Sequence, residues 1–116
     1  MNKKIESIKS VLEKKIDINV TNEKGENCLH ISSKNDANLK IIKFLLENKA
    51  NPNQTNNNGS TPFHYLCKSK QNIECVLLFL QNGALNNFKD KNNKTPSQIA
   101  NFFKNFEIES TILNFK

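Results

Sequence analysis

The chain has 116 residues, enough for one domain, and its 36% apolar content is low for a core built around a single centre. All 17 basic residues are lysine, which against 11 acidic residues gives a net charge of +6 and a pI near 9.3. The absence of arginine argues against nucleic-acid recognition, because bidentate contacts with phosphate or guanine favour the guanidinium group. No apolar run approaches the length of a membrane span and no signal peptide follows Met1, so we expect an intracellular protein, cytoplasmic or nuclear.

An apolar stripe with helical spacing recurs along the chain every 34 residues. The spacing i, i+3, i+6, i+7 marks one face of a helix, and we expect that face to be buried. The stripes are Ile5, Ile8, Val11 and Leu12; Leu39, Ile42, Leu45 and Leu46; and Val76, Phe79 and Leu80. An offset of 34 aligns loops and helices without a gap, so the chain is predicted to be a stack of repeats.

A shorter helix is predicted before each of the later stripes. Pro62 and Pro96 suit the first turn of a helix, where the missing N–H costs nothing, and Thr61 and Thr95 suit the N-cap. The segments 48–59 and 82–93 are rich in asparagine and contain glycine, which is the turn chemistry of a connecting hairpin. Each unit is therefore predicted to run helix, turn, helix, hairpin.

These signals predict an all-α solenoid of helix-turn-helix repeats with short β-hairpin-like connecting loops, in a single domain spanning residues 1–116. Residues 1–21 are expected to form a partial N-terminal repeat or cap. Full repeats are expected at 22–55 and 56–89, and a divergent C-terminal repeat or cap at 90–116.

Two segments carry a family resemblance. Residues 59–64, Gly-Ser-Thr-Pro-Phe-His, and residues 76–84, Val-Leu-Leu-Phe-Leu-Gln-Asn-Gly-Ala, resemble the ankyrin-repeat pattern G-x-T-P-L-H followed by V-x-L-L-L-x-x-G-A. The resemblance spans essentially the whole chain and is strongest in residues 56–89. It implies ankyrin-type repeats and binding of another protein.

The resemblance also assigns roles to particular positions. Asn19, Asn53 and Asn87 occupy the asparagine that orders each hairpin loop through bonds from its side chain to the backbone. Gln98 stands where the motif has histidine, so we expect the first turn of the last unit to be held less tightly.

His30 and His64 are the only histidines, and with Cys28 or Cys67 one of them could form a nucleophile and base pair. Both histidines occupy the same repeat position, which favours a structural role, and the resemblance implies that they link neighbouring repeats. The three cysteines lack the spacing of a zinc site and are expected to be buried thiols. We expect no enzyme activity, no metal and no cofactor.

Stacking buries the apolar faces and leaves the hairpin tips and the free side of the inner helices as a concave strip. The resemblance places a partner protein there. The strip's predicted contact residues are Thr21, Glu23, Lys24, Glu26, Lys34, Asn35, Thr55, Asn57, Asn58, Ser60, Lys68, Ser69, Lys89, Lys91, Asn92 and Lys94.

The last unit is rich in phenylalanine, which a polar capping repeat would not need. In one interpretation some of these rings close the core, while Ile108, Ile112 and Leu113 form the final outer helix. In the other they form an exposed apolar patch for a partner or a second copy, with Phe102 and Phe103 as contacts. The rings concerned are Phe102, Phe103, Phe106 and Phe115. We expect a monomer, with self-association through these rings as the alternative.

The sequence thus predicts a non-catalytic protein-interaction module, acting as adaptor, scaffold or inhibitor. An alternative is electrostatic binding of nucleic acid or an anionic membrane surface through lysines such as Lys89, Lys91 and Lys94. A further alternative is the repeat domain of a larger enzyme or channel.

Overall fold

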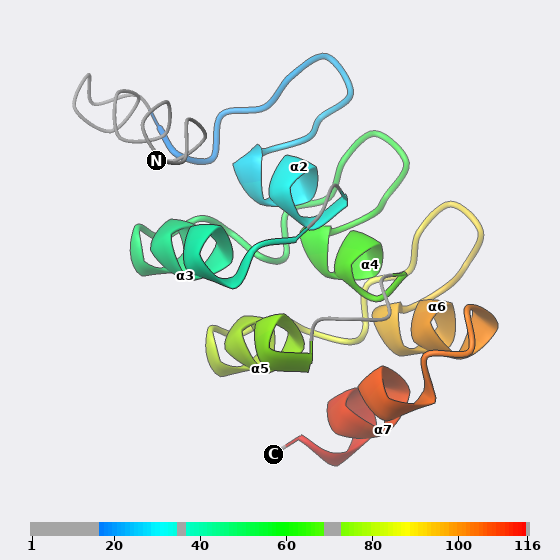
Figure 1. Ribbon diagram of the computed structural model, residues 1–116. Coiled ribbons are helices and arrows are strands. Elements are labelled where there is room, and N and C mark those ends of the chain that lie inside the picture. Colours follow the sequence, from blue (N-terminus) through cyan, green and yellow to red (C-terminus); the bar gives the residue numbers. More distant parts are fainter. Residues whose placement is uncertain (1–16, 35–36, 69–72, 116) are drawn as a thin grey trace.

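The helices of the chain stack in two rows, with hairpin loops projecting from one side (Figure 1). The computed structural model describes residues 17–34, 37–68 and 73–115. Within these ranges there are six helices and no strand: α2 (Cys28–Lys34), α3 (Leu39–Glu47), α4 (Pro62–Leu66), α5 (Ile73–Gln81), α6 (Pro96–Phe102) and α7 (Phe106–Asn114). The inner row is α2, α4 and α6, beside the hairpins, and the outer row is α3, α5 and α7. The predicted all-α repeat architecture is confirmed, while the stripe from Ile5 to Leu12 lies outside the described residues.

The inner helices α4 and α6 begin with the same capping arrangement. Thr61 Oγ1 accepts a hydrogen bond from the His64 backbone N–H at 3.3 Å, and His64 Nδ1 accepts one from the Thr61 N–H at 3.0 Å. Gln98 replaces the histidine in α6, where its Oε1 accepts from the Thr95 N–H at 2.9 Å. The predicted caps are confirmed. The expected loosening of the first turn of α6 is wrong, because glutamine can make the same local bond.

The core lies between the two rows. Phe63 of α4 and Phe79 of α5 are fully buried, and their rings stack with centroids 5.6 Å apart. In α3 the buried face consists of Ile41, Ile42, Leu45 and Leu46. The prediction that Leu39 belongs to this face is wrong: its side chain is 37% exposed, because it lies in the first turn of α3, and Ile41 is buried instead. Cys67 and Cys75 are buried as predicted.

Each of the two histidines joins its own repeat to the hairpin that follows. His30 Nε2 donates to the Ser60 carbonyl and His64 Nε2 to the Lys94 carbonyl, both at 2.8 Å. Their Nδ1 atoms accept backbone N–H groups of their own repeats, so each ring is neutral with its proton on Nε2. Burial lowers the pKa of both rings. The predicted link between repeats is confirmed.

Asparagine amides make a second link, on the loops that follow the outer helices. Asn53 Oδ1 accepts from the Leu85 N–H at 2.9 Å, and its Nδ2 donates to the Gly83 carbonyl at 2.8 Å. Asn19 bonds the loop after α3 in the same way. Asn87 is exposed, and its side chain makes no hydrogen bond within the described part of the chain. The first two asparagines therefore order the loops as the resemblance implied, by bonding to the next repeat.

We expect the free energy of unfolding to fall as the pH falls below about 6.5, the ordinary histidine pKa. The fold lowers the pKa of both rings, so the unfolded chain takes up protons first. The stability that the two neutral rings contribute is complete above the histidine pKa of the unfolded chain, and it is lost as the pH falls towards the lower pKa of the folded protein. Urea titrations near pH 7.5 and near pH 5.5 measure the difference.

The His64→Gln variant can still cap its own helix, as Gln98 does in α6, but it loses the hydrogen bond to the Lys94 carbonyl. It should be about 1 kcal/mol less stable than wild type at the higher pH, and its stability should depend less on pH. Equal wild-type stability at the two values would contradict the neutral-histidine assignment.

The amide links are expected to stabilise the stack measurably. Replacement Asn53→Ala removes two inter-repeat hydrogen bonds and should lower the free energy of unfolding by about 1 kcal/mol. The control Asn87→Ala occupies the same repeat position and should leave it within about 0.5 kcal/mol of wild type. Thermal and urea unfolding of the three proteins provide the comparison, and equal losses in both variants would refute the link.

Candidate functional site

The three hairpin tips have one backbone shape, set by a side-chain oxygen that recurs every 34 residues. Asn22, Asn56 and Asp90 each accept two backbone N–H bonds through Oδ1, from the residues two and four positions ahead. The distances lie between 2.9 and 3.0 Å. A backbone bond from the first to the fifth residue closes each tip, for example Asn56 N–H to the Ser60 carbonyl at 2.9 Å. The hairpin-like loops are therefore fixed by local chemistry.

Neighbouring tips are also joined to each other. The Asn57 N–H donates to the Lys24 carbonyl and the Lys91 N–H to the Asn58 carbonyl, both at 2.9 Å. Gly25 lies at this junction with a φ of +76°, which L side chains rarely adopt, and an added Cβ would lie 3.0 Å from the Asn57 backbone nitrogen. The close approach therefore requires glycine, and the tips form one continuous surface.

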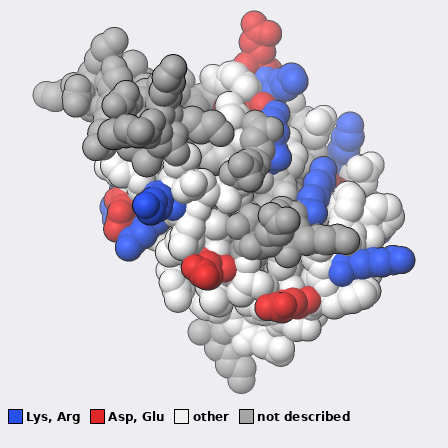
Figure 2. Space-filling model, in the orientation of Figure 1, with Lys and Arg blue, Asp and Glu red and all other residues white. Residues whose placement is uncertain are grey.

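Most of the predicted strip residues are exposed on this surface. Figure 2 shows lysine side chains spread down the side of the molecule from which the hairpins of Figure 1 project. Asn35 and Ser69 lie outside the described residues, and Glu26 and Ser60 are buried. The exposed members are Thr21, Glu23, Lys24, Lys34, Thr55, Asn57, Asn58, Lys68, Lys89, Lys91, Asn92 and Lys94.

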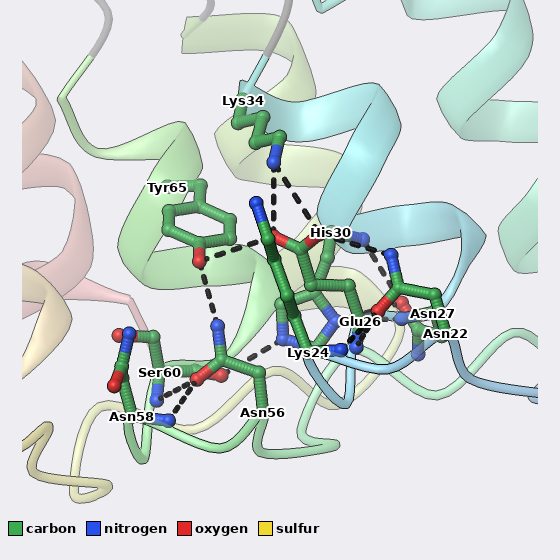
Figure 3. A network of polar contacts seen from close by, with 10 residues as sticks. All are labelled: Asn22, Lys24, Glu26, Asn27, His30, Lys34, Asn56, Asn58, Ser60 and Tyr65. Carbon is green, nitrogen blue, oxygen red and sulfur yellow. Dashed lines mark hydrogen bonds and ion pairs between the residues drawn. The ribbon is translucent and has the colours of Figure 1, made fainter.

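Glu26 is the clearest correction to the predicted strip. Its side chain is only 5% exposed, and its carboxylate pairs with Lys34 Nζ at 3.0 Å. The same carboxylate accepts hydrogen bonds from Asn22 Nδ2 at 3.1 Å and from the Tyr65 hydroxyl at 3.4 Å. The Glu26 side chain therefore points into the junction between two repeats (Figure 3). The Asn22 hydrogen bond, and then Lys34, lower the pKa of Glu26 despite its burial. The Glu26 carboxylate therefore binds groups of this chain and is not presented to a partner.

Ser60, which has the same repeat position as Glu26, is also withdrawn from the surface. Its N–H donates to Asn56 Oδ1 at 2.9 Å and its carbonyl accepts the His30 bond. The backbone of Ser60 thus holds the second tip in place, which explains its burial.

A hollow of about 350 Å³ lies on the inner side of the two repeats that contain α4 and α6, which are the second and third repeats if the one with α2 is counted first. Its apolar lining includes Tyr65, Ile99, Phe102 and Phe103, and its charged lining includes Lys68, Asp90 and Lys94. The Lys68 ammonium lies 5.5 Å from the centre of the Tyr65 ring. Lysines and the two phenylalanines were predicted contacts, whereas Tyr65 and Ile99 were not. Their shared repeat position with the exposed Ile31 was the signal that could have identified them.

The C-terminal phenylalanines do not close the core. Phe102, Phe103, Phe106 and Phe115 are 70%, 40%, 56% and 41% exposed. Ile108 and Ile112 bury the inner face of α7 instead, and Leu113, predicted on the same helix, is 62% exposed. Of the two interpretations, the structure supports the exposed apolar patch.

The histidines and cysteines are poorly placed for chemistry. Both nitrogens of each histidine ring are hydrogen-bonded inside the fold. Burial raises the pKa of the Cys28 and Cys67 thiols, and burial followed by the charge of Glu74 raises that of Cys75 to about 11. A thiol must ionise to act as a nucleophile, so these side chains serve packing.

Comparison with known proteins identifies the repeats. The sequence matches the family described as ankyrin repeats (3 copies) over residues 1–90 and, in a second match, over residues 34–114. A search of curated proteins found no match. Among the described helices, none has the length and apolar character needed to cross a membrane.

The partly buried Lys34–Glu26 ion pair should be detectable by a double-mutant cycle. Lys34→Met leaves the Glu26 carboxylate without its cation, and Glu26→Gln removes the charge. We expect the double variant to be more stable than the sum of the single losses implies, with a coupling of about 0.5–1 kcal/mol because Lys34 is partly exposed. Urea unfolding near neutral pH measures it. The control Lys68→Met, at the same position one repeat on, should change stability by less than about 0.5 kcal/mol. Additive losses would show that the pair contributes nothing.

Proposed function

Since the chain belongs to the ankyrin-repeat family, we propose that it is an adaptor, scaffold or inhibitor that binds another protein along the strip of hairpin tips and inner helices. Ankyrin repeats generally bind other proteins, and domains built from them are typically non-catalytic. The binding residues proposed are the exposed members of the strip.

One observation carries this proposal: the exposed side chains of three tips are displayed on a backbone already fixed by internal bonds. Two backbone hydrogen bonds join the tips, and histidine bonds hold two of them to the helices behind. A surface that is ordered before binding loses little conformational entropy when a partner docks. The strip is therefore suited to binding by shape and polar complementarity.

The proposal includes a cytoplasmic or nuclear location. All three cysteines are free, and two of them are buried. Free thiols are usual where the surroundings are reducing.

Lysine-mediated binding of nucleic acid or an anionic membrane is the competing function. Lys89, Lys91 and Lys94 are all exposed near the third tip, which favours it. Glu23 at the first tip and Asp90 at the third interrupt the positive charge along the strip. Such binding would weaken steeply with salt, because it depends on counterion release.

The immobilised chain should capture a partner protein from a lysate of the source cells through the strip. The variant Lys24→Glu, Asn58→Ala, Lys91→Glu changes only side chains, since the bonds between tips use the backbone of these residues. We expect it to bind the purified partner at least tenfold more weakly, or about 1.4 kcal/mol. The control Lys40→Glu, Lys43→Glu, Asn114→Ala makes the same changes on exposed positions of the outer helices and should bind normally.

Calorimetry near 0.15 M and near 0.5 M salt separates the two functions. A protein partner that is lost equally from both variants would contradict the strip. Binding that is confined to nucleic acid or anionic vesicles and disappears at the higher salt would replace the proposal by its competitor.

A further inference from the structure

Three positions of the repeat line the inner side of the stack, and the set of side chains at these positions differs from one repeat to the next. The first position is Glu26, Ser60 and Lys94 in successive repeats; the second is Ile31, Tyr65 and Ile99; the third is Lys34, Lys68 and Phe102. Glu26, Ile31 and Lys34 line a first hollow, beside the first hairpin tip. The other six line the second hollow, which is the one of about 350 Å³ described above. The repeat therefore provides its own comparison for each site.

In the first repeat the lysine charge is neutralised internally. Lys34 Nζ lies 3.0 Å from Glu26 Oε2, and the carboxylate is further bonded by Asn22 and Tyr65 (Figure 3). Glu23 and Lys24 also line this hollow, so its two glutamates and two lysines balance and it carries no net charge.

In the second hollow the equivalent lysine, Lys68, has no carboxylate at the repeat position of Glu26. Ser60 occupies the repeat position of Glu26 in this lining, and Lys94 adds a second ammonium group to that of Lys68. Both lysines are exposed, and neither forms an ion pair within the described residues. The one carboxylate in the lining, Asp90, already accepts the N–H groups of Asn92 and Lys94. The rim therefore carries positive charge that an external anion would match.

The same hollow exposes aromatic surface. Phe102 is 70% exposed and Phe103 40%, with their rings edge to face at 5.2 Å, and the largely buried Ile99 also lines the hollow. The volume of about 350 Å³ is at the small end for a whole ligand but sufficient for one large side chain. Exposed aromatic rings in a hollow are the usual anchor of a protein interface.

We propose that this hollow receives an aromatic or large aliphatic side chain of a partner segment that carries a carboxylate beside it. The apolar group packs on Phe102, Phe103 and Ile99, and the carboxylate pairs with Lys68 and Lys94. The inference rests on the proposed protein-binding function and specifies the chemistry of the partner.

The test uses the intact chain and a library of random linear peptides of about 12 residues, which extend to about 40 Å and can cross the whole strip. Selection on the immobilised chain should enrich peptides that have Asp or Glu within a few residues of Phe, Trp, Tyr or Leu. The best fluorescein-labelled peptide is then titrated by fluorescence polarisation.

Two substitutions and two matched controls locate the site. Phe102→Ala and Lys68→Gln should each weaken binding of the peptide at least tenfold. The controls Leu113→Ala and Lys43→Gln, which change an exposed leucine of α7 and an exposed lysine of α3, should leave binding unchanged. Replacing the acidic residue of the peptide by its amide should reproduce the Lys68→Gln loss. Circular dichroism establishes that all four variants are folded.

The remaining outcomes overturn the inference. Enriched peptides without an acidic and apolar pair, or the absence of any enrichment, would remove the stated chemistry. If the two variants lose binding of a labelled oligothymidylate rather than of the peptide, the hollow is a site for single-stranded nucleic acid. Concentration-dependent dimers abolished by Phe102→Ala would assign it to a second copy. Peptide binding that is lost in the Lys24, Asn58 and Lys91 variant but kept in the Phe102 and Lys68 variants would refute this hollow alone. It would still support protein binding by the strip.

Discussion

A histidine side chain that bonds the next hairpin is the interaction on which the stack depends. The ring of His30 reaches the carbonyl of Ser60, and that of His64 the carbonyl of Lys94. Each ring also caps its own inner helix, so one buried side chain fixes the start of a helix and the position of the following loop. A buried imidazole can do both only when neutral, because Nδ1 must accept while Nε2 donates. The display of the hairpin tips follows from this constraint.

The charge distribution on the inner side follows from how the junctions differ. Glu26 is held between two repeats by groups from both, which uses one acid and one lysine internally. The corresponding place in the next repeat has Ser60, whose side chain is too short and uncharged to meet Lys68. With Ser60 in place of an acid and Lys94 as a second ammonium group, the lining of the second hollow carries more lysine than carboxylate.

Periodicity was sufficient to predict the fold, because the repeat spacing fixes which faces pack and where the caps lie. Thr61 and Thr95 could be assigned as caps from the proline that follows each of them, and the link made by both histidines from the family resemblance. Burial at the junctions could not. Glu26 seemed to belong to the surface because its partners, Asn22, Lys34 and Tyr65, come from two repeats and meet only in the folded stack. The exposure of Phe102 likewise depends on which neighbour covers the end of α6.

The bonds between repeats also determine the range over which the chain must be brought together. The histidine links join residues 30 apart, the asparagine links 30 or 32, and the Tyr65 bond to Glu26 spans 39. None of these links requires the two ends of the chain to meet, so each repeat can dock on its neighbour as a separate event. During synthesis, one repeat can dock as soon as its successor has left the ribosome, so the surface can assemble one hairpin at a time.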